Sequence, residues 1–154
     1  MPKKYARFLP LTDSFQLEDF PFYWISQVNA QYTQNIDHVL KKYGLDNSRR
    51  RILIALHSKP HTSVSELAEM IVAKMSTTTK IIYRLKDEGY IETYACQDDG
   101  RITRVYLTEQ GQQMIKKIND ITTVVLQQSF DGLTPLQIEK MIGTMRQISK
   151  NLIR

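Results

Sequence analysis

The segment 76–108 constrains the fold more than any other part of the chain, because it combines two different periodicities. Its first part, 76–85, has apolar side chains on one face at helical spacing and hydroxyl-bearing or basic side chains on the other faces. Gly89 follows at the place where a helix commonly ends. Two β-prone segments, 90–97 and 102–107, come next, and a turn of the Asp-Gly kind separates them. The segment therefore predicts a helix, a stop and a β-hairpin.

A polar, basic helix followed at once by a basic-tipped hairpin is the layout of a winged helix-turn-helix. In that layout the helix enters the major groove of DNA, and the hairpin tip reaches the minor groove or the backbone. Hydroxyl and basic side chains can bind phosphates or base edges, and a threonine methyl can pack on a thymine methyl. The alternative for this group of side chains is a solvated helix face. The candidate DNA contacts on the helix are Ser76, Thr77, Thr78, Thr79, Lys80, Tyr83 and Arg84.

The residues before this helix fit the first half of a helix-turn-helix. Ser63 and Glu66 stand three residues apart, which is the spacing of a capping box at the start of a helix. A short helix and a turn at 72–75 then lead into the predicted recognition helix. Backbone amides at a capped helix start are suited to bind phosphate. We therefore add Ser63 and Ser65 to the candidate DNA contacts.

These motifs resemble the MarR family of bacterial transcription regulators. The predicted hairpin carries that family's pattern of Asp, any residue, Arg, three residues, Val, any residue, Leu and Thr, here from Asp99 to Thr108. Segments 63–68 and 76–92 are similar to the family's first helix and to its recognition helix with the first wing strand. The resemblance is most specific over 49–111, and the order of the predicted helices agrees with it elsewhere.

The resemblance implies roles for the hairpin tip and for the whole protein. In the family the acid of this pattern, here Asp99, braces the turn and the arginine, and the arginine, here Arg101, is inserted at the minor groove. We expect Arg104 to point to the same end, within reach of phosphate. The alternative is a plain charged hairpin tip. The resemblance also implies a homodimer that binds a pseudo-palindromic operator as a repressor and is released by a small molecule.

Long helices are predicted on both sides of the DNA-binding segment. Helices over 20–43, over 109–128 and from 135 onward each carry an apolar stripe or an aromatic cluster. These surfaces exceed what a small DNA-binding module needs to cover itself, so we expect a dimer interface built from both ends of the chain. The expected fold is mainly α with a small β-hairpin wing. Its expected parts are an N-terminal arm and dimerisation helix at 1–46, a winged helix-turn-helix domain at 47–108 and C-terminal dimerisation helices at 109–154.

Aromatic and basic residues outside the DNA-binding segment suggest a small-molecule site. Aromatic side chains crowd the start of the first long helix, where an amide lies beside an indole, a pair that suits a small aromatic ligand. Three consecutive arginines, 49–51, open the next helix, which Asn47 or Ser48 can cap. Cations there oppose the helix dipole, so an anion should compensate them: Asp46, an acid of the partner subunit, DNA phosphate or a ligand carboxylate. The candidate ligand contacts are Phe20, Tyr23, Trp24, Gln27, Arg49 and Arg50.

The expected effector is a small aromatic carboxylate or its thioester, which the resemblance also implies for many family members. Two other interpretations stay open for the same residues. The aromatic cluster can pack in the core or in the dimer, and the arginines can form salt bridges within the dimer. The family often has Trp-Arg in its second helix, where this chain has Arg50 and Arg51.

Composition narrows the partners and excludes several classes of protein. The chain of 154 residues has a net charge of +5 and a pI of about 9.3, which is mild support for an anionic partner. Its single cysteine, Cys96, excludes an internal disulfide and a cysteine-based zinc cluster, and we expect neither metal nor cofactor. The sequence shows no glycine-rich phosphate loop and no nucleophile motif, which argues against an enzyme. No apolar run approaches the roughly 18 residues of a membrane span, so we expect no membrane partner and a cytoplasmic protein.

Two rival functions remain. Cys96 can act as a redox switch, but it lies on a predicted wing strand, whereas redox-sensing members of the family place the thiol near the first helix, where this chain has none. The other rival is a non-enzymatic helical interaction protein. Such a protein has no need for a hairpin that carries Arg101 and Arg104.

Overall fold

The computed structural model describes residues 3–153, which form helices and one small antiparallel sheet. The mainly α fold with a β-hairpin wing is confirmed. In chain order the elements are η1 (Lys3–Phe8), η2 (Leu17–Asp19), α1 (Pro21–Lys41), α2 (Asn47–Ser58), β1 (Thr62–Ser63), α3 (Val64–Met70), α4 (Met75–Asp87), β2 (Ile91–Ala95), β3 (Thr103–Leu107), α5 (Glu109–Ser129) and α6 (Pro135–Leu152).

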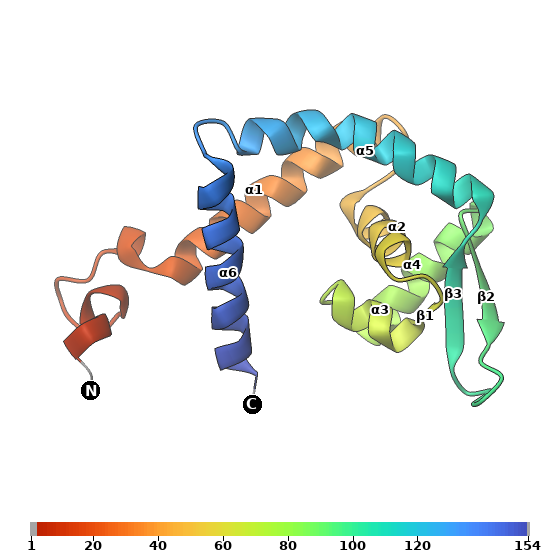
Figure 1. The fold of residues 1–154 in the computed structure, drawn as a ribbon, viewed down its shortest axis with the longest axis horizontal. Coiled ribbons are helices and arrows are strands. Elements are labelled where there is room, and N and C mark those ends of the chain that lie inside the picture. The colour runs from red at the N-terminus through yellow and green to blue at the C-terminus, as the bar shows by residue number, and fades with distance from the viewer. Residues whose placement is uncertain (1–2, 154) are drawn as a thin grey trace.

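The elements form an arch (Figure 1). Helices α1 and α5 pack along each other and make its top. One leg is a compact lobe that contains α2, α3, α4 and the three strands, and the other leg is α6, with the N-terminal arm beyond it. None of the helices among residues 3–153 combines the length and the apolar character that crossing a membrane requires.

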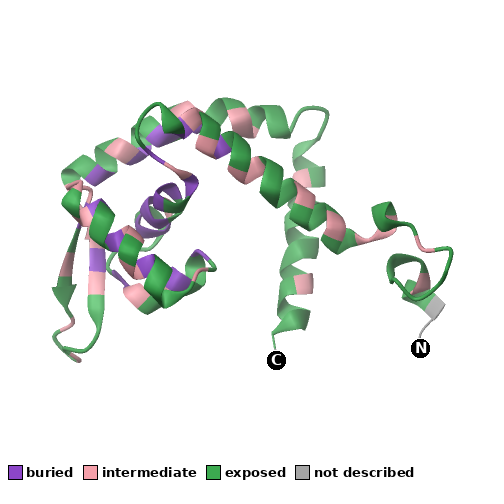
Figure 2. Ribbon diagram, turned by 180° about the vertical axis from the view of Figure 1, so that it is seen from behind, coloured by how far each residue is buried: buried purple, intermediate pink, exposed green. Residues whose placement is uncertain are grey.

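The apolar core lies in the compact lobe and below the adjoining part of the arch (Figure 2). Each of four helices contributes fully buried aliphatic side chains to it: Ile36 and Leu40 from α1, Leu53 from α2, Leu85 from α4 and Ile118 from α5. Burial of this kind stabilises a fold by about 1.5–3 kcal/mol for each large side chain. The core therefore fixes α4 against α2, and α2 against the top of the arch.

The wing is a hairpin of β2 and β3, and β1 extends it to three strands in the order β1-β3-β2. Ile91 pairs with Leu107 at its base and Ala95 with Thr103 towards its tip. The sequence predicted the hairpin but not β1. This strand is only two residues long, and its Ser63 also caps α3, so the local pattern indicates a helix start instead.

Local signals placed most helix ends correctly. The capping boxes of α3 and α6 are present, and Gly44 and Gly89 adopt the left-handed backbone conformation that ends a helix, with φ of 70° and 82°. The predicted cap of α2 was wrong. Asp46 caps this helix, because its Oδ1 accepts the backbone N–H of Arg49 at 2.8 Å, and Asn47 is the first helical residue.

Helix α6 stands apart from the rest of the chain. None of its described side chains is buried, although it carries a regular apolar stripe. The exposed members of this stripe include Met141, Ile142 and Met145. An apolar helix face that meets no other part of its own chain is typical of a surface made for another chain.

Candidate nucleic-acid interface

Helix α4 turns one face to the core and the other outwards. Ile82 and Leu85 are buried, and this side of α4 packs against α2 and α3. The outward face carries the hydroxyl and basic side chains that the sequence assigned to DNA. Ser76, Thr77, Lys80, Tyr83 and Arg84 are all exposed, and Tyr83 keeps 66% of its surface.

Thr78 does not belong to this outward face. It is fully buried, and its hydroxyl donates to the Lys74 carbonyl at 3.0 Å. The helical period explains the difference, because Thr78, Ile82 and Leu85 recur at spacings of four and three residues and so share one face. We remove Thr78 from the candidate DNA contacts.

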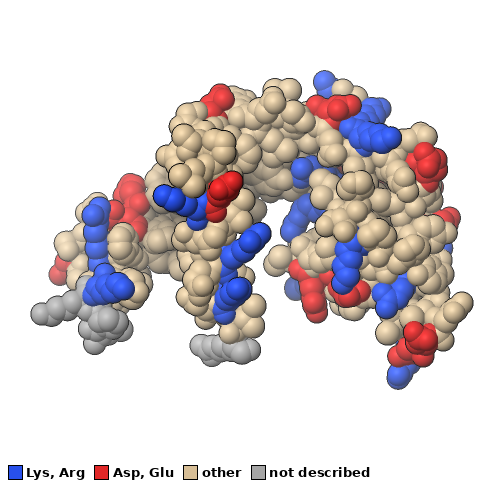
Figure 3. Space-filling view, in the orientation of Figure 1, with Lys and Arg blue, Asp and Glu red and all other residues tan. Residues whose placement is uncertain are grey.

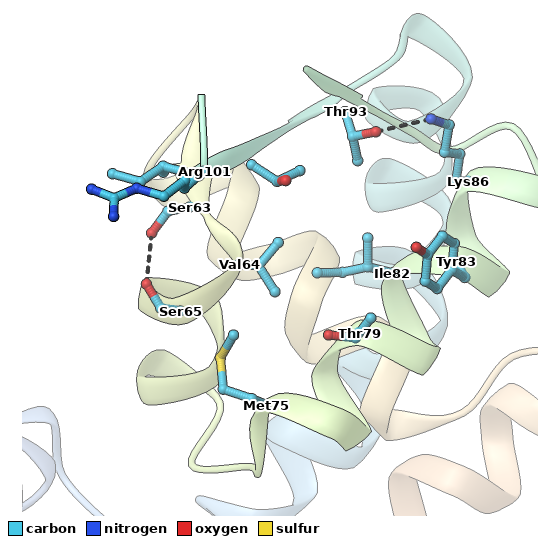
Figure 4. A pocket seen from close by; sticks show the side chains of 12 residues that line it. Ser63, Val64, Ser65, Met75, Thr79, Ile82, Tyr83, Lys86, Thr93 and Arg101 are labelled. Carbon is cyan, nitrogen blue, oxygen red and sulfur yellow. Dashed lines mark hydrogen bonds between the residues drawn. The ribbon is translucent and has the colours of Figure 1, made fainter. Parts of the chain in front are cut away.

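A groove of about 380 Å³ separates α4 and the start of α3 from the wing (Figure 4). Its inner wall includes the apolar side chains of Val64 and Ile82. Polar side chains surround this apolar strip, so the groove has the mixed character of a surface that meets base edges and sugars. Of the sequence-predicted contacts, those that line it are Ser63, Ser65, Thr79, Tyr83 and Arg101.

The two serines at the start of α3 differ in whether the hydroxyl is engaged in capping the helix. Ser63 is buried, and its hydroxyl accepts the backbone N–H of Glu66 at 3.2 Å, so this hydroxyl is engaged in capping. Ser65 is exposed, and its Oγ lies 3.2 Å from that of Ser63. Hydrogen bonds from Lys59 and from the backbone and hydroxyl of Ser63 lower the pKa of Glu66 to about 2, which keeps the capping carboxylate charged.

Arg101 lies at the hairpin tip with 92% of its side chain accessible. Its Nε and Nη2 donate to the two carboxylate oxygens of Asp99 at 3.1 and 3.2 Å, and its backbone N–H also donates to Asp99. These hydrogen bonds lower the pKa of Asp99. Figure 4 shows the Arg101 guanidinium projecting outwards, and Asp99 restricts its orientation.

Arg104 does not point to the same end as Arg101, contrary to expectation. Its Nη1 donates to the His61 carbonyl at 3.0 Å and lies 3.8 Å from Glu66 Oε2. Successive strand residues face opposite sides of a sheet, and Thr103 lines the groove, so Arg104 lies on the other side. It connects β3 to the residues before α3.

Sequence reasoning missed several groove residues. Lys86 lies three residues after Tyr83 on the same side of α4, and its Nζ donates to Thr93 Oγ1 at 2.8 Å. Helical spacing from Tyr83 indicates Lys86, whereas Thr103 is the first residue of β3 and has no earlier strand position from which to count. The other groove residues that the predicted contacts did not include are Val64, Met75, Ile82, Thr93 and Ile102.

Basic and acidic side chains are interspersed over the face shown in Figure 3. Lys and Arg side chains occur on both legs of the arch, including the sides that face each other, and acidic side chains accompany them at the hairpin tip. On this face, therefore, the basic side chains are not gathered into a single patch.

The predicted ligand contacts on α1 lie near its start. Trp24 is half exposed, and its indole N–H donates to the Glu18 carbonyl at 2.8 Å. Phe20, Tyr23 and Gln27 are half-buried, and the rings of Tyr23 and Trp24 meet edge to face at 5.2 Å. The Trp24 side chain therefore helps to hold the N-terminal arm against α1.

The predicted role of Arg49 in ligand binding does not agree with its surroundings. Its guanidinium is buried and donates to Asp46, to the Gly44 carbonyl and to Glu88. Each of its three nitrogens already has an acceptor and the side chain is buried, so the guanidinium is not open to a ligand carboxylate. The anion that compensates this arginine is supplied by the same chain.

Arg50 differs from Arg49 in that it lines an open cavity. Its Nη1 donates to the Tyr32 hydroxyl at 2.6 Å, and its Nε is buried without a hydrogen-bond partner among the described residues. Arg50 and Tyr32 line an open cavity of about 390 Å³ between α1, α2 and the end of α3. The other residues around this cavity are Arg51, Ile54, Ala55, Ser58, Met70 and Ile71.

Cys96 lies beyond the end of β2 and is partly exposed. The Arg104 guanidinium and the backbone N–H groups of Asp99 and Asp98 lower the pKa of its thiol. Within residues 3–153 there is no group of three or more side chains of His, Cys, Asp or Glu placed to hold a metal ion.

Comparisons with known proteins agree on one family. A sequence model of the MarR family matches residues 45–103. The HTH-type transcriptional repressor IacR of Pseudomonas putida is 41% identical over 143 residues, which are 93% of this chain and 86% of that protein.

Solved structures give the same fold. A MarR family transcriptional regulator from Silicibacter pomeroyi has a TM-score of 0.82 at 22% identity, over 90% of this chain and 92% of that one. Bordetella bronchiseptica BpsR, whose DNA binding is regulated by 6-hydroxynicotinic acid, has a TM-score of 0.76 at 17% identity, over 88% and 96% of the two chains. The chain belongs to the MarR family, whose members are transcription regulators and not enzymes.

Proposed function

We propose that this protein is a homodimeric repressor that binds a pseudo-palindromic DNA operator and is released by a small aromatic carboxylate or its thioester. The observation that supports DNA reading most is the groove between α4 and the wing, with exposed hydroxyl and basic side chains on α4 and Arg101 beyond it. The proposed place of action is the cytoplasm, where the operator lies.

In the proposed complex α4 lies in the major groove and the hairpin tip reaches the flanking minor groove. Asp99 restricts the orientation of the Arg101 guanidinium before DNA binds, so this side chain loses less conformational entropy on binding. Lys86 joins the set, because it lies in the groove beside Tyr83. The proposed DNA contacts are Ser65, Ser76, Thr77, Thr79, Lys80, Tyr83, Arg84, Lys86 and Arg101.

The proposed homodimer rests on the surfaces that the single chain leaves uncovered. Met141, Ile142 and Met145 of α6 are exposed, as are Phe22 and Trp24 near the start of α1. Helix α6 and the start of α1 lie at the same end of the arch (Figure 1). A second copy that covers both would place two α4 helices on one face of DNA. Two-fold symmetry of the protein then corresponds to two-fold symmetry of the operator.

The proposed effector site is the cavity between α1 and α2. Arg50 and Arg51 supply the cations for a carboxylate, and Tyr32 supplies an aromatic face beside them. The regulation of BpsR by 6-hydroxynicotinic acid, an aromatic carboxylate, supports the proposed ligand class. An effector that binds one arrangement of the dimer better than the other lowers operator affinity.

Selection of bound DNA from a random duplex library tests the proposed DNA reading. We expect an enriched palindrome with half-sites about one helical turn apart. Binding to that duplex should weaken by about 1–3 kcal/mol in Arg101→Ala, because a well-placed contact is lost. The matched control is Arg146→Ala, which removes an exposed arginine of α6. Weak, strongly salt-dependent binding without an enriched sequence would instead mean a merely basic surface.

Release of the selected duplex by 6-hydroxynicotinic acid or by benzoate tests the proposed effector class. Tyr32→Phe removes the hydroxyl that accepts from Arg50, and Arg51→Gln removes a cation of the cavity. Both should reduce release while leaving operator affinity unchanged, because neither residue lines the groove beside α4. Trp24→Ala serves as the comparison for the site first expected on α1. If Trp24→Ala alone impairs release, the effector lies at the start of α1 and the proposed cavity is wrong.

A further inference from the structure

Arg49 is a buried cation in the first turn of α2, where the helix dipole disfavours a positive charge. Its side chain is 4% exposed. Its Nε lies 3.3 Å from Asp46 Oδ2, its Nη1 lies 2.5 Å from Glu88 Oε1, and its Nη2 donates to the Gly44 carbonyl. The fold therefore compensates this charge with acceptors from two directions.

These acceptors belong to separate parts of the molecule. Gly44 and Asp46 lie in the connection that follows α1, and Glu88 is the residue that ends α4. The Arg49 side chain thus ties the end of α1 to the end of α4. In the proposed dimer α1 belongs to the dimerisation region and α4 to the DNA-reading region.

Glu88 is the centre of this arrangement. Its Oε1 also lies 3.4 Å from Nε of Arg84, an exposed residue one helical turn earlier on α4. Its Oε2 is buried and has no hydrogen-bond partner among the described residues. A neutral side chain in place of Glu88 would leave Arg49 with one compensating carboxylate in place of two, and a partly compensated buried charge weakens the packing around it.

We infer that Glu88 is a positioning residue for DNA reading: through Arg49 it fixes the orientation of α4 relative to α1. The inference rests on the proposed homodimer and its operator. If α1 is held by the partner subunit, the orientation of α4 sets the separation of the two recognition helices. That separation determines which half-site spacing the dimer accepts.

The test compares two duplexes that differ only in half-site spacing. One is the palindrome that the wild-type protein selects, and the other has a single base pair inserted at its centre, which shifts one half-site by about 3.4 Å and turns it by about 34–36°. The measured quantity is the dissociation constant for the duplex with the insertion divided by that for the selected palindrome, and we call it the spacing ratio. Loss of folded protein lowers binding to both duplexes equally, so a merely structural role leaves this ratio unchanged.

We expect Glu88→Gln to lower this ratio about tenfold, which corresponds to about 1.4 kcal/mol and is the scale of one charge-assisted hydrogen bond. Arg49→Lys interrupts the same contacts from the other side, because one ammonium cannot serve all of the acceptors that the guanidinium binds. It should lower the ratio in the same way and gives a second measurement if Glu88→Gln folds poorly.

Two further variants separate this role from the loss of charge. Glu92→Gln removes an exposed acid that lies 3.7 Å from Lys86 of α4 but does not reach α2. Arg84→Gln keeps the Arg49–Glu88 pair and removes only the exposed arginine. Both should leave the spacing ratio at the wild-type value, and Arg84→Gln should weaken binding to both duplexes alike.

An unchanged ratio in both Glu88→Gln and Arg49→Lys would overturn the inference while the proposed function stands. A fall in Glu92→Gln as large as in Glu88→Gln would also overturn it, since any loss of negative charge would then be sufficient. Failure of the wild-type protein to select a palindrome would remove the proposed dimeric reading and this inference together.

Discussion

Replacing Gly111 by alanine should destabilise the protein, although alanine favours helices. Gly111 is the third residue of α5 and is buried against the start of the wing. A Cβ at this position would lie 2.0 Å from the Tyr90 carbonyl oxygen and 3.3 Å from a Leu107 methyl. The Tyr90 oxygen belongs to the backbone and accepts the Thr108 N–H at 3.1 Å, so it cannot simply rotate away.

The magnitude follows from two opposing effects. Alanine gains about 1 kcal/mol over glycine in a helix interior. Relief of the close contact requires α5 and the start of β2 to separate by about 1 Å, and overpacking of this kind costs about 1–3 kcal/mol or more. Separation also lengthens the bond from the Gly111 N–H to the capping Thr108 hydroxyl, now 3.0 Å, and loss of a cap costs about 1 kcal/mol. The expected net loss is about 2 kcal/mol.

Thermal unfolding at fixed protein concentration measures this loss, because a dimer makes Tm concentration-dependent. For a chain of this size about 2 kcal/mol lowers Tm by about 4–8 °C. Gly143→Ala is the matched control, since a Cβ there meets nothing within 4 Å and lies on the side of α6 opposite its apolar stripe. It should raise Tm slightly. A Gly111→Ala protein that melts at or above the wild-type temperature would refute the reasoning.

Three further predictions concern stability. Val72 is a β-branched residue with a φ of 53° and 86% exposure. Val72→Gly should relieve about 1–2 kcal/mol of backbone strain, whereas the added entropy of the unfolded chain costs about 0.5–1 kcal/mol. Urea unfolding should therefore show a net gain in the free energy of unfolding. The pKa of Glu66 is lowered from 4.5 to about 2, so its stabilising contribution is complete above pH 4.5 and is lost as the pH falls towards 2. In Glu66→Gln the free energy of unfolding should therefore fall less steeply between pH 4.5 and pH 2 than in the wild-type protein. Thr108→Ala should lose about 1 kcal/mol of cap energy in urea unfolding, whereas Thr123→Ala on exposed α5 surface should lose less.

The elements that the sequence predicted well are those governed by neighbouring residues. Ser63 with Glu66 and Thr134 with Gln137 form capping boxes because the partners lie three residues apart, whatever the rest of the chain does. Gly89 ends α4 for a similarly local reason. The helix, stop and hairpin could therefore be predicted before any tertiary contact was known.

The features that the sequence did not predict depend on residues far apart in the chain, or on which face of a helix or sheet a single residue occupies. Arg49 was assigned to a ligand because Glu88, one of the two carboxylates that bind it, lies 39 positions away. Thr78 and Thr79 look equivalent in the sequence, yet one residue of helical phase buries the first and turns the second towards the groove. Arg104 was misplaced because a single step along β3 reverses the face of the sheet.

The double role of Ser63, as a residue of β1 and as the cap of α3, divides the wing into two parts with different tolerance to change. Where β3 pairs with β1, a shift of β3 by one residue would reverse its faces and disturb the start of α3 as well, because Ser63 pairs with Arg104. The tip beyond Ala95 and Thr103 shares no residue with α3. Exchange of the tip between related regulators should therefore alter which flanking DNA is recognised while the helix-turn-helix keeps its fold.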